Sequence, residues 1–223
     1  MFARKLLRLL IWNLGLSLTL TGGFVSQALA STPPPVSGTV IVRCLDNVGN
    51  EIRGSGVVIP RRAAAVIPSK KASAVVTAAH VVADCVPEST VVIVGTTEFS
   101  GQVVKQDPLR DVALLRVAGR IKPSSLSIGV VVPVAGATVA IRGAAAPGPV
   151  TQHGGTIRAA TPNSLEVTGG ASDGQSGGGV FDSANRFLGI IVAGDDTKLY
   201  AVPLPEMCGL ALSVTRCGST PWR

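Results

Sequence analysis

The chain has 223 residues, a formal net charge of +7, 46% hydrophobic residues and only 4% aromatic residues. Part of the positive charge belongs to the first 30 residues, which carry three basic and no acidic side chains and leave 17 Lys and Arg against 13 Asp and Glu, a net charge of +4. A surplus this small, without an arginine-rich segment, argues against a nucleic-acid-binding protein, which needs a clustered basic face.

Residues 1–30 have the three parts of a secretory signal peptide. Basic residues precede an apolar run from Leu6 to Val25, and the segment ends with the small residues Ala28-Leu29-Ala30. We therefore expect cleavage near Ala30 and a secreted or periplasmic protein. An uncleaved leader would instead be a membrane anchor, and only in that case do we expect contact with a membrane.

Residues 31–38 form a proline-rich lead-in, and the remainder alternates between Gly- or Pro-containing turns and short runs of Val, Ile, Leu and Ala. Such runs predict β-strands. So many short strands predict a sandwich or barrels and disfavour a parallel α/β fold. The expected strands are 38–45, 54–59, 74–77, 90–94, 99–106, 112–117, 138–142, 154–160, 164–167, 179–181, 187–193 and 199–202.

Two helical segments are expected, one turn over 81–84 and a C-terminal helix over 204–212, where Pro205 suits a first turn. Residues 60–71 form a basic, alanine-rich connection between strands. We expect this connection to be exposed.

All four cysteines, Cys44, Cys85, Cys208 and Cys217, follow the leader, in a part of the chain where export would preserve disulfides. Three connectivities are possible. We favour Cys44 with Cys85, which would clamp the segment around His80, and Cys208 with Cys217, which are close in sequence. The spacings that zinc prefers are missing, so no metal site is expected from these thiols.

Three motifs contain candidate catalytic side chains: Thr77-Ala78-Ala79-His80, Asp111-Val112-Ala113-Leu114-Leu115 and the polar Asp173-Gly174-Gln175-Ser176-Gly177-Gly178-Gly179. A serine hydroxyl is a poor nucleophile unless a base removes its proton, and a carboxylate is needed to hold the tautomer of that base. The chain has only two histidines. The other, His153, is interpreted as a surface or strand-end residue without chemistry.

These motifs, in this order, resemble the chymotrypsin/trypsin-like serine peptidase family. Gly54-Ser55-Gly56-Val57-Val58 and Leu199-Tyr200-Ala201-Val202-Pro203 are similar to its bacterial, Deg-type branch. The resemblance covers nearly all the mature chain and implies two packed six-stranded antiparallel barrels with the active site between them. A serine peptidase domain over 39–223 would comprise barrel one at about 39–120, barrel two at about 121–205, and a C-terminal helix and tail at about 204–223.

The resemblance implies that Ser176 attacks a carbonyl carbon, that His80 is the general base and that Asp111 orients the imidazole. The N–H groups of Gly174 and Ser176 would form the oxyanion hole. Asp107 competes with Asp111 for the carboxylate role, but Asp107-Pro108 suits a turn and the apolar run after Asp111 suits a carboxylate entering a buried strand.

Substrate-binding positions implied by the resemblance are Gly170, Val192, Ala193, Gly194 and Lys198. Without an acid at the base of the pocket, a preference for Lys or Arg is not expected. An inward-pointing Lys198 would favour an acidic side chain, whereas a Lys198 that points to solvent or pairs with Asp195 or Asp196 would favour a small apolar one, the reading we prefer.

The family pattern is broken at Gln175, where trypsin-like zymogens carry the carboxylate that binds a newly freed amino terminus. Activation by that salt bridge is therefore not expected. Val192 stands where many members carry a serine, so Asp111 is expected to have one hydrogen bond fewer.

The leading hypothesis is an exported serine endopeptidase that acts on polypeptides and needs neither cofactor nor metal. Two alternatives remain at this point: a catalytically silent, peptidase-like binding or scaffold protein, and an esterase with the same triad.

Overall fold

A computed structural model describes residues 38–60, 64, 71–121, 126–128 and 133–211. The expected leader, most of the lead-in and of the 60–71 connection, and the C-terminal tail lie outside these residues. Within them, no helix is long and apolar enough to cross a membrane.

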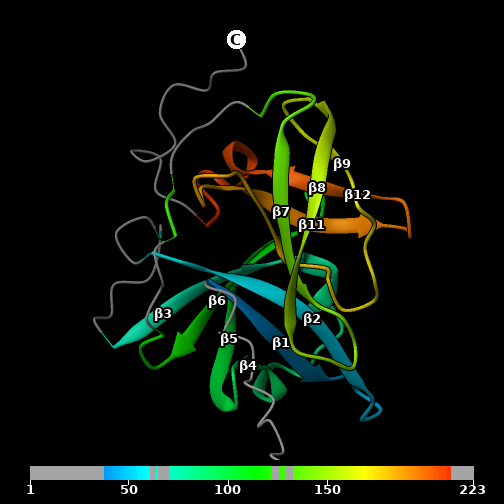
Figure 1. Cartoon of the computed structure of the whole chain (residues 1–223). Helices are drawn as coiled ribbons and strands as arrows, with labels where there is room; N and C mark the ends of the chain where they lie inside the picture. Colours follow the sequence, from blue (N-terminus) through cyan, green and yellow to red (C-terminus); the bar gives the residue numbers. More distant parts are fainter. Residues whose placement is uncertain (1–37, 61–63, 65–70, 122–125, 129–132, 212–223) are drawn as a thin grey trace, which may run out of the picture. The chain divides into compact units, whose positions relative to one another are not determined.

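The first half of the described chain forms a closed antiparallel barrel with the strand order β1-β2-β3-β6-β5-β4 (Figure 1). Neighbouring strands pair with continuous registers, broken by one shift in β5 between Val103 and Lys105. The strands are β1 (Thr39–Leu45), β2 (Glu51–Ile59), β3 (Ala72–Thr77), β4 (Val91–Val94), β5 (Thr97–Asp107) and β6 (Val112–Ala118).

The second half forms another closed antiparallel barrel, in the order β10-β11-β12-β9-β8-β7. Its strands are β7 (Thr138–Ala144), β8 (Val150–Ala160), β9 (Leu165–Thr168), β10 (Gly179–Phe181), β11 (Phe187–Gly194) and β12 (Lys198–Pro203). All twelve expected strands are therefore present, with ends that differ by a few residues, and the two-barrel fold class is confirmed.

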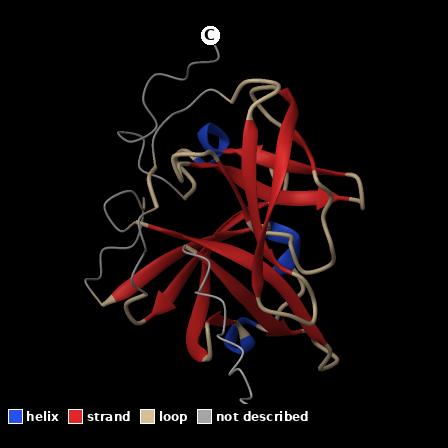
Figure 2. Cartoon of the chain, viewed as in Figure 1, coloured by secondary structure: helices blue, strands red, loops and turns tan. Residues whose placement is uncertain are grey.

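Helical structure in the described residues is limited to three short 3-10 turns: η1 (Ala79–Val81), η2 (Pro87–Ser89) and η3 (Leu204–Met207) (Figure 2). The prediction of a helix over 204–212 is wrong in extent. Cys208 already has an extended backbone, with ψ at 134°, and Gly209 has a left-handed φ of +79°, so the helical geometry cannot continue beyond Met207.

Buried side chains form three clusters. One fills the first barrel and includes Val42 and Leu115, and another fills the second barrel and includes Ile141 and Leu199. The third joins the barrels, because Val57 and Ile59 of β2 pack in it together with Phe181 and Phe187 from the second barrel. The barrels therefore share an apolar contact.

Strand β2 connects this shared core to the region of the candidate site. Side chains alternate along a strand, so Arg53, Ser55, Val57 and Ile59 lie on one face. Val57 and Ile59 pack in the shared core, while Ser55 and Arg53 hydrogen-bond to segments of the second barrel. One face of a single strand thus positions both hydrophobic and polar contacts between the barrels.

Candidate active site

His80 lies in η1 directly after β3, and Asp111 lies at the end of the β5–β6 turn, one residue before β6. Asp111 has a left-handed backbone, with φ at +54°, which turns its carboxylate toward η1. Its Oδ2 is 2.7 Å from His80 Nδ1 and its Oδ1 accepts the backbone N–H of His80 at 2.8 Å. An ionised carboxylate only accepts hydrogen bonds, so Nδ1 carries the proton and Nε2 is the basic nitrogen.

The competing carboxylate, Asp107, has a structural position. Its side chain accepts hydrogen bonds from the backbone N–H groups of Leu109 and Arg110 and forms an ion pair of 2.7 Å with the Arg110 guanidinium. Asp107 therefore stabilises the β5–β6 turn, while Asp111 contacts the histidine.

Each partner shifts the pKa of the other. The hydrogen bond from His80 to the Asp111 carboxylate raises the pKa of His80 above its ordinary 6.5, although partial burial opposes this change. Burial alone would raise the pKa of Asp111, but the hydrogen bonds from the His80 side chain and backbone outweigh it and lower that pKa. The pair favours an ionised carboxylate beside a histidine that accepts a proton readily.

The backbone around Ser176 is fixed through its carbonyl groups. The carbonyl of Asp173 accepts the N–H of Ala146 at 2.8 Å, and that of Gln175 accepts the N–H of Gly178 at 2.8 Å. Because the C=O and N–H of a trans peptide point in opposite directions, the N–H groups of Gly174 and Ser176 point away from these contacts. Among the described residues, neither N–H donates a hydrogen bond to a protein acceptor.

Left-handed glycines make this geometry possible. Gly174 has a φ of +86°, and a Cβ there would lie 2.6 Å from the carbonyl oxygen of Ala144. Gly177 has a φ of +82°, and a Cβ there would lie 2.1 Å from the carbonyl oxygen of Ser55. Neither position has room for a side chain.

Ser55 is a further functional candidate that the sequence interpretation missed. Its fully buried hydroxyl donates to the carbonyl of Gly174 at 2.7 Å and accepts the N–H of Ala144 at 2.8 Å. Its own N–H donates to the carbonyl of Ser176 at 2.7 Å. The signal was a serine between two glycines directly before the apolar run Val57-Val58-Ile59, where a buried hydroxyl requires partners.

A cleft of about 430 Å³ is lined by residues from both barrels. His80 and Ser176 both line it, but their side chains are not hydrogen-bonded to each other in the described structure. The lining residues are Ile52, Arg53, His80, Val81, Ala171, Ser172, Asp173, Gly174, Ser176, Ile191, Ala193 and Gly194. The cleft can therefore admit an acyl group beside a serine, a histidine and two free amides.

Comparison with known proteins identifies the family. Residues 54–190 match the trypsin-like peptidase domain. The chain belongs to this family. No curated protein matches the sequence.

Solved structures of several proteases have the same fold. The Rv3671c protease from M. tuberculosis in its active form has a TM-score of 0.67 and 24% identity, with 82% of each chain covered. The serine endoprotease from Yersinia pestis has a TM-score of 0.62 and 21% identity over 76% of this chain. The HtrA-type protease AlgW, solved with a tripeptide, has a TM-score of 0.63 and 19% identity over 76% of this chain. This chain spans 59% of the Yersinia protein and 57% of AlgW.

Two expected pocket residues of this trypsin-like peptidase, Ala193 and Gly194, line the cleft. Gly170 does not line it, because it packs against the backbone of Asp196, where a Cβ would lie 2.4 Å from the carbonyl oxygen. Val192 packs on the shared core and the first-barrel core instead. Lys198 is outside the lining as well, with its Nζ 5.4 Å from the centre of the Tyr200 ring.

Gln175, which the resemblance assigned to the zymogen carboxylate position, is buried. Its Oε1 accepts the backbone N–H of Ser172 at 3.2 Å. The side chain thus closes the loop onto itself within the described fold.

The predicted disulfide between Cys44 and Cys85 is present, with a Cα–Cα distance of 5.6 Å. It ties β1 to the segment that follows His80. Cys208 is also disulfide-bonded, and its expected partner, Cys217, lies outside the described residues. Within the described part of the chain, no three His, Cys, Asp or Glu side chains are grouped so that they could hold a metal ion.

Proposed function

We propose that the protein is an exported serine endopeptidase that hydrolyses peptide bonds with His80, Asp111 and Ser176 through an acyl-enzyme. The observation that carries this proposal is the His80–Asp111 pair on the same cleft as Ser176 and two amides without acceptors. Membership in the trypsin-like peptidase family supports a serine endopeptidase.

In the first step, Ser176 Oγ forms a bond to the substrate carbonyl carbon while His80 Nε2 takes the hydroxyl proton. The Gly174 and Ser176 amides stabilise the oxyanion, and Asp111 stabilises the imidazolium. His80 then protonates the leaving amine as the peptide C–N bond breaks. Water attacks the resulting ester by the reverse route and regenerates Ser176. The Ser176–His80 hydrogen bond that this route needs forms in the substrate complex, as such bonds often do.

The pocket favours a small apolar side chain on the acyl side of the scissile bond. Ala171 and Gly194 lie so close together that a Cβ at residue 194 would be 2.7 Å from that of Ala171. With Lys198 over the Tyr200 ring, no cation from this strand enters the cleft. The space therefore suits alanine- or valine-sized groups.

Export is the second part of the proposal. Its support is the signal-peptide pattern of residues 1–30 together with disulfide bonding at Cys44, Cys85 and Cys208. Disulfides persist in secreted and periplasmic proteins.

A fluorophosphonate probe tests the proposal on the mature protein, with Ser100→Ala as a matched control on an exposed serine of β5. We expect covalent labelling and casein digestion by the wild type and Ser100→Ala, and neither by Ser176→Ala. A folded protein without label would instead favour the silent scaffold. Label with turnover of small esters but no casein digestion would favour the esterase.

A further inference from the structure

Arg53 is a half-buried cation on the wall of the cleft. It lies on the same face of β2 as Ser55, two residues along the strand. Its guanidinium reaches across to the second barrel, where one terminal nitrogen donates to the carbonyl of Gly148 in the β7–β8 turn. A guanidinium carries five N–H donors, so this contact leaves most of them available.

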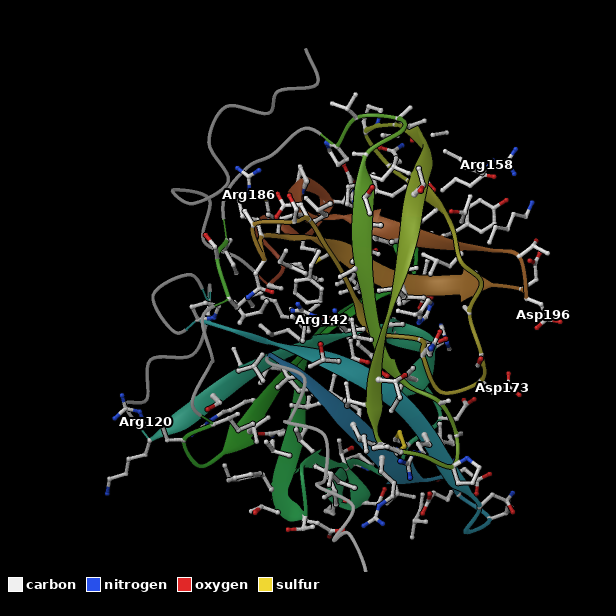
Figure 3. All side chains as sticks on the ribbon, viewed as in Figure 1. Arg120, Arg142, Arg158, Asp173, Arg186 and Asp196 are labelled. Carbon is white, nitrogen blue, oxygen red and sulfur yellow. A yellow bond between two sulfur atoms is a disulfide. The ribbon has the colours of Figure 1, made fainter. Side chains whose placement is uncertain are left out.

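No carboxylate of the described residues forms an ion pair with Arg53. Arg43, its cross-strand partner, is instead paired with Glu98 at 2.8 Å and Glu51 at 3.8 Å. Asp173, the other charged cleft residue near the serine, projects outward into solvent (Figure 3). Arg53 Nε is buried without an acceptor. Arg53 thus presents a positive charge on the cleft wall, and no carboxylate of the described residues is ion-paired with it, although the exposed Asp173 also lines the cleft.

The position of Arg53 relative to the serine indicates which part of a substrate it meets. The narrow acyl-side recess is formed by the second barrel, between Ala171 and Gly194. The leaving amine must lie toward His80, which protonates it, and therefore along the wall that the first barrel provides. Arg53 belongs to that wall.

We propose that Arg53 binds a carboxylate in the leaving-group segment of the substrate and makes the enzyme prefer acidic segments after the scissile bond. This inference rests on the proposed peptidase function. The carboxylate has two possible sources, an acidic side chain or the free C-terminus of a short leaving segment. Both would form the charge-assisted, two-pronged contact that arginine offers.

Acyl transfer to added amines measures this preference directly. A small alanine ester first acylates Ser176, and water and the amine then compete for the acyl group. The amine nitrogen forms an amide bond to the acyl carbon, the bond to Ser176 Oγ breaks, and the amine proton passes through His80 to Oγ. The probes are Ala-Glu-amide, Ala-Gln-amide and Ala-Gln with a free carboxylate, together with Glu-amide and Gln-amide.

We expect at least one carboxylate-bearing acceptor to compete about fivefold to tenfold better than its neutral counterpart in the wild type, and this advantage to decrease with added salt. Arg53→Gln should remove the advantage and leave aminolysis by Ala-Gln-amide unchanged. The same advantage for Ala-Gln with a free carboxylate as for Ala-Glu-amide would identify the carboxylate group itself as the ligand. An advantage for Ala-Glu-amide alone would assign the contact to an acidic side chain, and an advantage for Ala-Gln with a free carboxylate alone would assign it to the C-terminus of the leaving segment.

Arg43→Gln is the matched control, since it removes one positive charge from the adjacent strand without changing the cleft lining. It should keep the preference. Arg53→Met repeats the charge removal with an apolar side chain, and ester hydrolysis shows in each variant that the fold and the acylation step are intact.

Equal competition by charged and neutral amines would overturn the inference, as would an Arg53→Gln variant that loses aminolysis by both alike. The second result would mean that Arg53 only holds the β7–β8 turn in place. A loss of the preference in Arg43→Gln would also overturn it, because a general charge effect would then be the cause. Absence of ester turnover in the wild type would instead contradict the proposed function.

Discussion

At His80, one hydrogen bond to Asp111 sets both the orientation and the basicity of the imidazole. The base must be neutral to accept the Ser176 proton, so activity should fall as pH decreases through the pKa of His80. Because the contact with Asp111 raises that pKa above 6.5, the acid limb of kcat/KM should lie above pH 6.5. Measurement of kcat/KM from pH 5 to 9 tests this.

Asp111→Asn removes the carboxylate that raises the pKa, so its residual acid limb should move to lower pH. Its kcat should fall about 10⁴-fold, because the wrong imidazole tautomer is favoured. An unchanged acid limb in this variant would show that another group titrates.

Sequence patterns identified the His80, Asp111 and Ser176 candidates because each lies in a short motif whose residue types indicate its role without knowledge of the tertiary structure. The pocket residues were harder to predict, because their orientation depends on strand register. Val192 lies where the β11–β12 register shifts between Ile191 and Ala193, so it leaves the cleft wall. Lys198 faces outward because its neighbour Leu199 fills the second-barrel core.

At the scale of elements, β2 holds residues 173–179, the nucleophile loop after the proposed role of Ser176, through Ser55. Ser55→Ala should leave the carbonyl of Gly174 without its partner and loosen the loop that carries the proposed oxyanion-hole amides of Gly174 and Ser176. We expect kcat to fall roughly 10- to 100-fold with KM little changed, since a small misplacement of catalytic groups has a large cost. Steady-state kinetics with a small ester or peptide provides the measurement.

Ser73→Ala is the control for Ser55→Ala. The Ser73 hydroxyl also donates to one backbone carbonyl, that of Gly119, and accepts one backbone N–H, that of Ile121, but far from the nucleophile loop. Both variants should lose comparable stability, about 1–3 kcal/mol, and only Ser55→Ala should lose kcat. Equal kinetic losses in the two variants would reduce Ser55 to a structural role.

The Cys44–Cys85 disulfide joins β1 to the segment after η1, across 41 residues of sequence. Replacement of both cysteines by alanine should lower the free energy of unfolding by roughly 3 to 4 kcal/mol, chiefly because the unfolded chain regains freedom. Urea denaturation of the mature protein with and without the substitutions measures the difference. Coincident unfolding curves would contradict the prediction.

At the scale of the whole molecule, the twelve strands and the two-barrel class were predictable from short apolar runs and turn residues. The shared core was not predictable, because it depends on which face of β2 meets Phe181 and Phe187. The extent of the C-terminal helix was also mispredicted, since a proline suited to the first turn gave no sign that the backbone becomes extended at Cys208.

Phe181 tests how strongly the shared core couples the barrels. Its ring is fully buried, 5.6 Å from that of Phe187, and the Arg142 guanidinium lies 4.2 Å above it. Phe181→Ala should destabilise the protein by about 3–5 kcal/mol. Unfolding followed by circular dichroism and by loss of ester hydrolysis should remain one coincident transition.

Phe181→Leu should give a smaller loss, which keeps the test usable if the alanine variant does not fold. Phe99→Leu, the same substitution at a half-buried position of the first barrel outside the shared core, is the control for Phe181→Leu and should destabilise the protein less. Two separated transitions in the wild type would show that the barrels unfold independently.

The hydrogen bond that the Gln175 side chain accepts from Ser172 bears on when the enzyme would become active. Under the proposed mechanism, the Gln175 side chain holds the loop that carries the Gly174 and Ser176 amides, so the enzyme would become active on folding, without a newly freed amino terminus. Under the proposed export, a chain that folds after it has crossed the membrane would cleave other proteins only on the far side.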